Sequence, residues 1–306
     1  MGERKGLDAR ASGLMVILCI VWGLQQVILK LAAADIAPIM QIAIRCGLSA
    51  LLVLPLLQLQ PNTHLYSKAY LLPGIWLAFL FSAEFVFIAQ ALEFTSASHT
   101  VVLLYTAPIF VALGLHWKLP SERLSRLQWS GIMIAFAGIV MTFMGREKQL
   151  DQGLSQVLWG DFLALLAGLM WAMTTISLRL SKLNEAHPTQ TLFYQLVGGF
   201  IFLLPLAFIL GQAQIHWTYI AIGSLVFHTL IMSFMSLMLW FWLLRNYLAS
   251  HLGVFSFLTP LFGMLFGILF LNETIELNFI VGTMLVMLGV AVVSMQDWIK
   301  RKLQHV

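Results

Sequence analysis

The chain has 306 residues, of which 60% are hydrophobic and 10% are charged, and its formal net charge is +4. Soluble globular proteins carry about 25% charged residues, so this chain has too little polar surface to cover itself in water. A positive charge can indicate a nucleic-acid partner, but here the lysines and arginines lie between apolar runs and form no basic stripe. The composition predicts an integral membrane protein that binds no nucleic acid.

Ten apolar runs are each long enough to cross a hydrocarbon core as a helix. In chain order they cover residues 12–33, 37–58, 69–92, 96–119, 126–144, 158–180, 189–211, 217–243, 249–271 and 276–296. The first run follows basic residues, as a secretory signal peptide does. However, it is longer than the apolar region of a signal peptide and contains Gln25, Gln26 and Lys30. We therefore interpret it as a mature helix.

The basic residues predict how the spans are oriented, because Lys and Arg favour cytoplasmic loops. If the N-terminus is cytoplasmic, the outer side keeps only Lys30, Arg146 and Lys148, and Arg45 lies within a span. All other lysines and arginines then fall on the cytoplasmic side. This bias predicts that both termini are cytoplasmic and that the protein lies in a bacterial inner membrane.

The sequence repeats itself after 149 to 152 residues. The tripeptide Ala-Ser-His occurs at 97–99 and again at 249–251, and other matched pairs are Trp22 and Trp171, Lys30 and Arg179, Pro38 and Pro188, Pro108 and Pro260, and Glu122 and Glu273. We divide the chain into residues 1–148 and 149–306. Each half has five spans, an odd number, so the second half enters the membrane from the opposite side. Inverted repeats of this kind are typical of secondary transporters.

Two segments carry a family resemblance. The stretch from Ala91 to His99, followed by Tyr105-Thr-Ala-Pro108, resembles the fourth-helix signature of the EamA-type transporters in the drug/metabolite transporter superfamily. The stretch from Trp240 to Pro260, which closes at Leu271-Asn-Glu273, is similar to the matching signature of the second half. The resemblance implies ten helices, a central cavity and alternating access for small metabolites, most often in export. It also implies that the fifth and tenth helices lie outside the substrate path.

Four polar residues on the first four spans come out about eight or nine residues below the outer surface, at a rise of about 1.5 Å per residue. They are Gln25, Arg45, Glu84 and Tyr105. Ionisable residues at such depth usually face the bundle interior. One interpretation is a structural ion pair between Arg45 and Glu84. The other is a binding site, in which Arg45 attracts a carboxylate or phosphate and Glu84 is a titratable counter-charge.

Further polar and aromatic residues extend this layer. Gln41 shares a helical stripe with Arg45, and tryptophans at repeat-related positions are suited to lining a cavity or to packing. The full set of predicted substrate-binding residues is Trp22, Gln25, Gln41, Arg45, Glu84, Tyr105, Trp171, Thr174, Gln195, Ser236 and Trp240. Glu84 and His228 are candidates for proton coupling. Pro108 and Pro260 interrupt repeat-related helices, either as hinges or simply as kinks. His99 and His251 are interpreted as interfacial or gating residues.

These features predict a secondary active transporter that exports a small organic metabolite by alternating access, with proton coupling as a hypothesis. An amino acid or a related anionic or zwitterionic solute fits Arg45, and a drug-like compound fits the aromatic residues. The alternatives are a lipid or lysolipid flippase and a membrane-embedded enzyme. No phosphate loop, zinc motif or nucleophile elbow is present in the sequence, so we predict no catalytic residue, cofactor or metal. The expected partners are the solute and membrane lipid, and paired glycines in the fifth and tenth spans suit either a monomer or a weak homodimer.

Overall fold

The computed structural model describes residues 8–60, 65, 67–118, 123–144, 154–247, 252, 256 and 258–304. These described residues form a helical bundle without a β-strand. One isolated antiparallel β-bridge joins Ile36 to Ile215. Within the described ranges, seven helical segments are long and apolar enough to cross a membrane. Three shorter apolar helices accompany them, Arg126–Thr142, Leu258–Leu271 and Leu277–Val293. The protein is therefore an all-helical, multi-pass membrane protein.

The helices follow the predicted runs in order. They are α1 (Ala9–Leu31), α2 (Pro38–Gln58), α3 (Lys68–Phe94), α4 (Ala97–Leu104), α5 (Ala107–Lys118), α6 (Arg126–Phe143), α7 (Leu154–Leu180), the 3-10 turn η4 (Lys182–Glu185), α8 (Pro188–Ile209), α9 (Tyr219–Val226), the π-helix η5 (Phe227–Met235), α10 (Ser236–Asn246), α12 (Leu258–Leu271) and α13 (Leu277–Gln304). Begin and end points differ from the predicted runs by a few residues. The largest differences are at the end of α13 and at the start of α12, where most of residues 248–257 lie outside the described ranges.

The predicted run 96–119 is two helices rather than one kinked helix. Pro108 has no N–H to donate, and its ring would clash with the carbonyl of Leu104. The chain therefore leaves the helix at Tyr105 and Thr106 and starts again at Ala107. The Thr106 hydroxyl donates to the Leu103 carbonyl at 2.6 Å, which satisfies one of the freed acceptors. Pro260 lies in the first turn of α12, and most of the residues just before it are outside the described ranges.

The predicted run 217–243 contains an irregularity that its apolar pattern does not indicate. It begins as the α-helix α9, continues through nine residues of π-helix and ends as α10. A π-helix shifts each backbone hydrogen bond by one residue and is often found at functional sites. Its repeat counterpart α3 is one unbroken α-helix of 27 residues.

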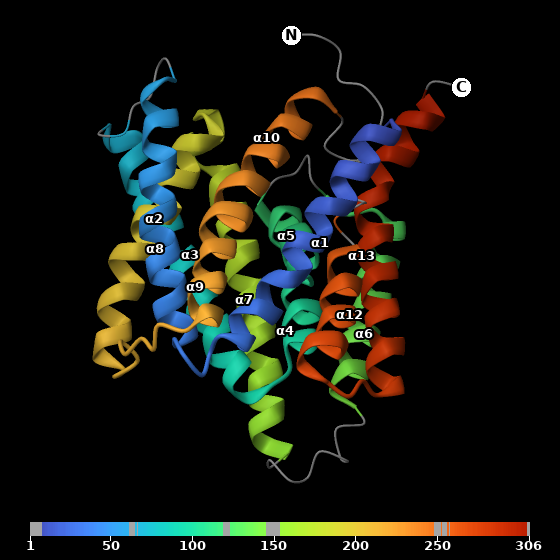
Figure 1. Ribbon diagram of the computed structural model, residues 1–306. Helices are drawn as coiled ribbons and strands as arrows, with labels where there is room; N and C mark the ends of the chain where they lie inside the picture. The colour runs from blue at the N-terminus through green and yellow to red at the C-terminus, as the bar shows by residue number, and fades with distance from the viewer. Residues whose placement is uncertain are drawn as a thin grey trace.

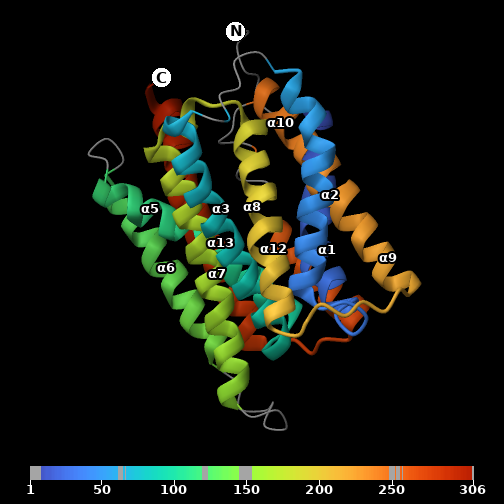
Figure 2. The same cartoon turned by 90° about the vertical axis from the view of Figure 1, so that its left-hand side faces the viewer.

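The helices run up and down across the bundle (Figures 1 and 2). In Figure 1, α1 starts at the upper end and runs downward, whereas α7 starts at the lower end and runs upward. The start of α1 and the end of α13 both lie at the upper end. The two parts of the chain interdigitate, because α2 packs on α8, α3 on α7, α4 on α12 and α6 on α13.

Glycines bring α6 and α13 into backbone contact. A Cβ atom added at Gly131 would lie 2.9 Å from the carbonyl oxygen of Gly289, and one added at Gly138 would lie 2.7 Å from that of Gly282. Small residues let membrane helices approach this closely and gain van der Waals contact. The paired glycines of the fifth and tenth runs are thus used for packing within the chain.

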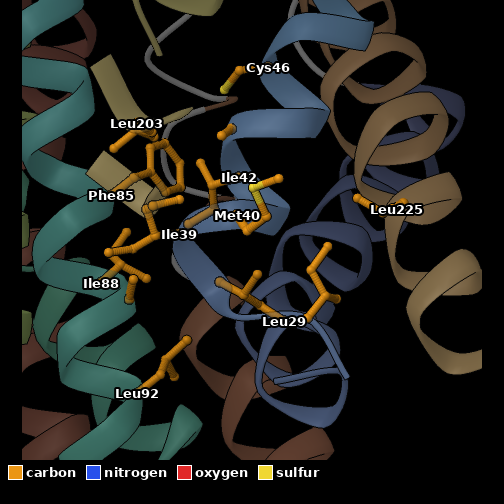
Figure 3. Close-up of a cluster of buried hydrophobic side chains, with 14 of the residues drawn as sticks. Leu29, Ile39, Met40, Ile42, Cys46, Phe85, Ile88, Leu92, Leu203 and Leu225 are labelled. Carbon is orange, nitrogen blue, oxygen red and sulfur yellow. The ribbon is translucent and has the colours of Figure 1, made fainter. Parts of the chain in front are cut away.

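The largest apolar cluster surrounds α2. Figure 3 shows Ile39 and Ile42 of α2 close to Phe85 and Ile88 of α3, all of them buried. Leu203 of α8 belongs to the same cluster. Since lipid is as apolar as these side chains, the cluster stabilises the bundle through close packing more than through exclusion of water. It also fixes the part of α2 that carries Arg45.

Candidate functional site

Arg45 is buried in the middle of α2, with 3% of its surface exposed. Its guanidinium carbon lies 4.4 Å from the centre of the Phe85 ring, a cation–π contact. Its Nε and Nη1 atoms are buried and have no hydrogen-bond partner among the described residues. An aromatic face offers no acceptor in the plane of the guanidinium, so donor groups of Arg45 are left without an acceptor.

Glu84 precedes Phe85 on α3 and is also buried, with 8% of its surface exposed. Among the described side chains, Arg45 and Glu84 form no contact ion pair, although their charges are close enough to interact. The structural ion pair that the sequence left open is therefore not formed in this state. Phe85 takes the position over the guanidinium instead, which leaves the two charges near each other but unjoined.

A second buried cluster lies between α1, α2, α9 and η5, and its polar groups are bonded to one another. The Ser224 hydroxyl donates to Gln41 Oε1 at 2.6 Å, and Gln41 Nε2 donates to the carbonyls of Leu29 at 3.1 Å and Ile36 at 2.8 Å. His228 Nδ1 lies 2.8 Å from the Ser224 carbonyl. These bonds satisfy groups that would otherwise be costly to bury.

The second ring nitrogen of His228 extends this cluster to the first helix. His228 Nε2 lies 3.1 Å from the Gln25 carbonyl of α1. The side chain thus bridges η5 and α1, two elements that are far apart in the sequence. Arg45 is close enough for its charge to act on His228.

The predicted aromatic residues form two separate pairs. Trp22 and Trp240 meet edge to face with ring centres 5.4 Å apart, and Trp22 Nε1 donates to the Ser236 hydroxyl at 3.2 Å. Tyr105 and Trp171 meet in the same manner at 5.2 Å. All four rings are half-buried. The two repeat-related tryptophans therefore have different partners.

The predicted residues Thr174 and Gln195 lie on α7 and α8. Thr174 is buried, and its hydroxyl donates to the Met170 carbonyl of its own helix at 3.0 Å. Gln195 is half-buried in α8. His251 lies outside the described residues. The structure therefore brings most of the predicted layer into the bundle interior and arranges it as distinct groups rather than as one continuous lining.

Two hollows lie in the described part of the bundle. A groove of about 400 Å³ runs along α2, α9 and η5, with Leu51, Ile222 and Leu230 in its walls. A hollow of about 10 Å³ lies beside Tyr105 and Pro260. Neither is lined by Arg45 or Glu84, which are covered on both sides by the bundle.

A family model of the EamA-like transporter family matches residues 10–144 and again residues 158–295. The chain belongs to the EamA-like transporter family. The two matches cover most of the chain and correspond to its two halves in the sequence. As a member of this family, with its several apolar helices and its bacterial relatives, it is a multi-pass inner-membrane protein.

Curated relatives of this EamA chain are transporters by name. An uncharacterized transporter, YoaV, of Bacillus subtilis is 26% identical over 90% of this chain and 94% of its own length. Proteins named probable amino-acid metabolite efflux pump in Salmonella typhimurium and Escherichia coli are each 26% identical, over 92% of this chain and 94% of theirs. A chain of known crystal structure has a TM-score of 0.64 at 15% identity and covers 97% of this chain and 99% of that one, which shows a shared fold.

Sequence reasoning missed an acidic group at the lower end of this EamA fold. Asp161 of α7 is fully buried, accepts a hydrogen bond from the Thr95 hydroxyl at 2.5 Å and lies 3.4 Å from His99 Nδ1. The His99 ring stacks on Phe279 with centres 3.6 Å apart, so this histidine is buried within the protein. The signal was available, because an aspartate inside a run of apolar residues needs a polar partner.

Proposed function

We propose that this EamA protein is a secondary transporter that exports a small carboxylate-bearing metabolite, with Arg45 as the group that binds the carboxylate. The observation that carries the proposal is the buried guanidinium whose Nε and Nη1 have no hydrogen-bond partner among the described residues. A buried charge without hydrogen bonds is unfavourable, and an incoming carboxylate supplies the acceptors that Phe85 does not. The cation–π contact holds the guanidinium in place without occupying its donors.

Glu84 supports a zwitterionic solute such as an amino acid. Its carboxylate has no contact ion pair among the described residues and lies near Arg45. An α-amino acid presents a carboxylate and an ammonium group side by side, which would complement these two charges. The names of the two amino-acid metabolite efflux relatives point to the same solute class.

We propose that the chain crosses the membrane ten times, as two inverted halves of residues 1–148 and 149–306 with both termini cytoplasmic. The opposite directions of α1 and α7 in Figure 1 support this, as do the two separate family matches. The packing pairs support it too, because α2 with α8, α4 with α12 and α6 with α13 are each a helix and its repeat counterpart. Since the glycines of α6 and α13 are used internally, we take the monomer as the transporting unit.

His228 and Glu84 are proposed to hold the coupling proton. The Ser224 hydroxyl already donates to Gln41, so it can only accept from His228 Nδ1, as can the Ser224 carbonyl. Nε2 faces the carbonyl of Gln25. Among the described residues both ring nitrogens face acceptor oxygens, which would hold a second proton on the ring, whereas burial and the nearby positive charge of Arg45 oppose it. Loss of one proton would break the bridge between η5 and α1, while Glu84 would exchange its proton for the ammonium group of the solute.

The proposal is tested by uptake into proteoliposomes that contain the purified protein. A panel of labelled amino acids, dicarboxylates, nucleosides, sugars and cationic dyes is offered with and without a pH gradient. We expect gradient-dependent movement of carboxylate-bearing compounds only. Movement of none of the panel would contradict the transport proposal, and movement of neutral or cationic compounds alone would contradict the role of Arg45.

One observation favours a second function, the movement of lipids. The groove of about 400 Å³ along α2 and η5 is apolar and open at the side, and the exposed fractions of Leu51 and Ile222 in it are 66% and 46%. An acyl chain would fit such a groove. Leu51→Trp would fill it: if the flipping of fluorescent lysolipid falls in this variant while amino-acid transport is absent from both proteins, the lipid function is favoured.

A further inference from the structure

Two hydroxyl–aspartate hydrogen bonds close opposite ends of the bundle. At the lower end, Thr95 Oγ1 donates to Asp161 Oδ1 at 2.5 Å, and Thr95 is the C-cap residue of α3. At the upper end, the Tyr247 hydroxyl donates to Asp8 Oδ2 at 2.9 Å, and Tyr247 is the C-cap residue of α10. Figure 1 shows that α3 and α10 end at opposite ends of the bundle.

The two bonds are related by the internal repeat. Thr95 and Tyr247 are 152 residues apart, the offset that also relates the two Ala-Ser-His tripeptides. Their acceptors lie on the first helices of the halves, Asp161 in α7 and Asp8 at the N-cap of α1. At the offset of 149 residues Asp161 corresponds to Ser12, one helical turn beyond Asp8. Each bond therefore joins the end of the third span of one half to the first helix of the other half.

The lower end has an additional connection through Glu273, which follows α12. Glu273 accepts hydrogen bonds from the backbone N–H groups of Ala97 at 2.6 Å and Ser98 at 3.0 Å, and from the Ser98 hydroxyl at 2.6 Å. It thus caps the first turn of α4, where free N–H groups favour a negative charge. Lys30 lies 3.9 Å from the same carboxylate and donates to the Thr95 carbonyl. The repeat counterparts Glu122 and 249–251 lie outside the described residues.

We propose that these two bonds are the latches of two gates, a lower latch formed by Thr95 and Asp161 and an upper latch formed by Tyr247 and Asp8. The inference rests on the proposed function, since gates are needed only if the halves move relative to each other. Each latch crosses from one half to the other, so a rocking motion that opens one end must break the latch there.

Both latches are closed in this structure, and three polar residues of the layer between them are buried. The exposed fractions of Gln25, Arg45 and Glu84 are 6%, 3% and 8%. This arrangement corresponds to the occluded state of an alternating-access cycle. The upper latch is charge-assisted at neutral pH, because the N–H of Ala11 and the Tyr247 hydroxyl lower the pKa of Asp8.

The latches are tested by distances between spin labels, measured by double electron–electron resonance on the full-length protein. The background carries Cys19→Ala and Cys46→Ala. One labelled pair, Glu93→Cys and Gln156→Cys, spans the lower latch, and the other, Ala9→Cys and Asn246→Cys, spans the upper latch; all four positions are exposed. Thr95→Val and Tyr247→Phe each remove one hydroxyl with little change in shape.

We expect Thr95→Val to raise the population of long lower distances about tenfold while the upper pair is unchanged, and Tyr247→Phe to do the reverse. Thr95→Ser keeps the hydroxyl and should restore the wild-type distances. The matched controls are Thr142→Val, whose hydroxyl bonds only to Ile139 of its own helix at 2.7 Å, and Tyr219→Phe, at a residue that is 97% exposed.

Distances in both latch variants that match those in the controls would overturn the proposal, as would a lengthening of both pairs by either variant. The result is separable from the proposed function, because the distances are read without a solute. If each variant opens one end and no solute is transported, the latches stand and the transport proposal fails. If solutes are transported and neither end opens, only the latch proposal fails.

Discussion

Two buried polar clusters lie side by side in this protein and differ in how they are satisfied. In the first, His228, Gln41 and Ser224 are bonded to one another and to backbone carbonyls. In the second, Arg45 lies over Phe85, and within the described residues two of its nitrogens have no hydrogen-bond partner and Glu84 has no contact ion pair. A satisfied cluster stabilises a fold, whereas a poorly satisfied buried charge gains hydrogen bonds from a ligand, so we propose structure and proton coupling for the first cluster and recognition for the second.

The difference between the two polar clusters is tested most directly by replacing Arg45. Arg45→Gln should lower transport of a carboxylate-bearing solute at least about thirtyfold, since loss of one partner of a buried charge pair removes about 2 kcal/mol or more. Thermal stability should stay the same or rise, because a poorly satisfied charge is removed. Both are measured on the purified protein, by uptake and by thermal unfolding. Arg126→Gln at the exposed start of α6 is the control. A stability loss that accounts for the lost transport would assign Arg45 to structure.

His228 should give the opposite result. His228→Leu removes the bridge between η5 and α1, because the ring can no longer bond to the carbonyls of Ser224 and Gln25. We expect a loss of about 1–3 kcal/mol in the free energy of unfolding. It is measured by thermal or denaturant unfolding in detergent, with the exposed His216→Leu as the control. Equal stability of both variants would show that the hydrogen bonds of His228 contribute nothing to the free energy of unfolding.

Glu84→Gln removes the charge of this side chain and keeps its shape, so it tests what the carboxylate contributes to the second cluster. If Glu84 carries the coupling proton, the pH dependence of transport should flatten to within about twofold between pH 6 and 8, with folding unaffected. The measurement is initial uptake at a series of pH values. Gln90→Glu on the same helix adds a carboxylate elsewhere and should leave the pH profile of the wild type intact. An unchanged profile in Glu84→Gln would remove this residue from coupling.

The smallest effect is expected at the upper latch. The hydrogen bonds from Ala11 N–H and Tyr247 lower the pKa of Asp8 in the folded protein, so its carboxylate adds stability above its unfolded pKa, and this contribution is lost as the pH falls through the folded value. The stability difference between the wild type and Asp8→Asn should therefore be complete at pH 7 and vanish as the pH falls below about 4. Unfolding at several pH values checks this. A stability difference between the two proteins that grows as the pH falls would contradict this expectation.

The sequence predicted the helical runs and the burial of Arg45 and Glu84 inside the bundle, because apolar length and the cost of buried charge are local properties. It also indicated Pro108 as an interruption, although the result is a break at Tyr105 and Thr106 rather than a kink. The contact between Arg45 and Phe85 could not be predicted, since it depends on the rotation of α2 against α3. The π-helix at 227–235 likewise depends on tertiary contacts, among them the bridge through His228.

The central claim is that Arg45 binds the carboxylate of the solute. It is tested by measuring the dissociation constants of the identified solute and its methyl ester for the wild type and for Arg45→Gln. We predict that esterification weakens binding to the wild type at least about tenfold and changes binding to Arg45→Gln by less than about twofold, because the interaction is then already absent. The same loss in both proteins would contradict the claim and place the carboxylate elsewhere.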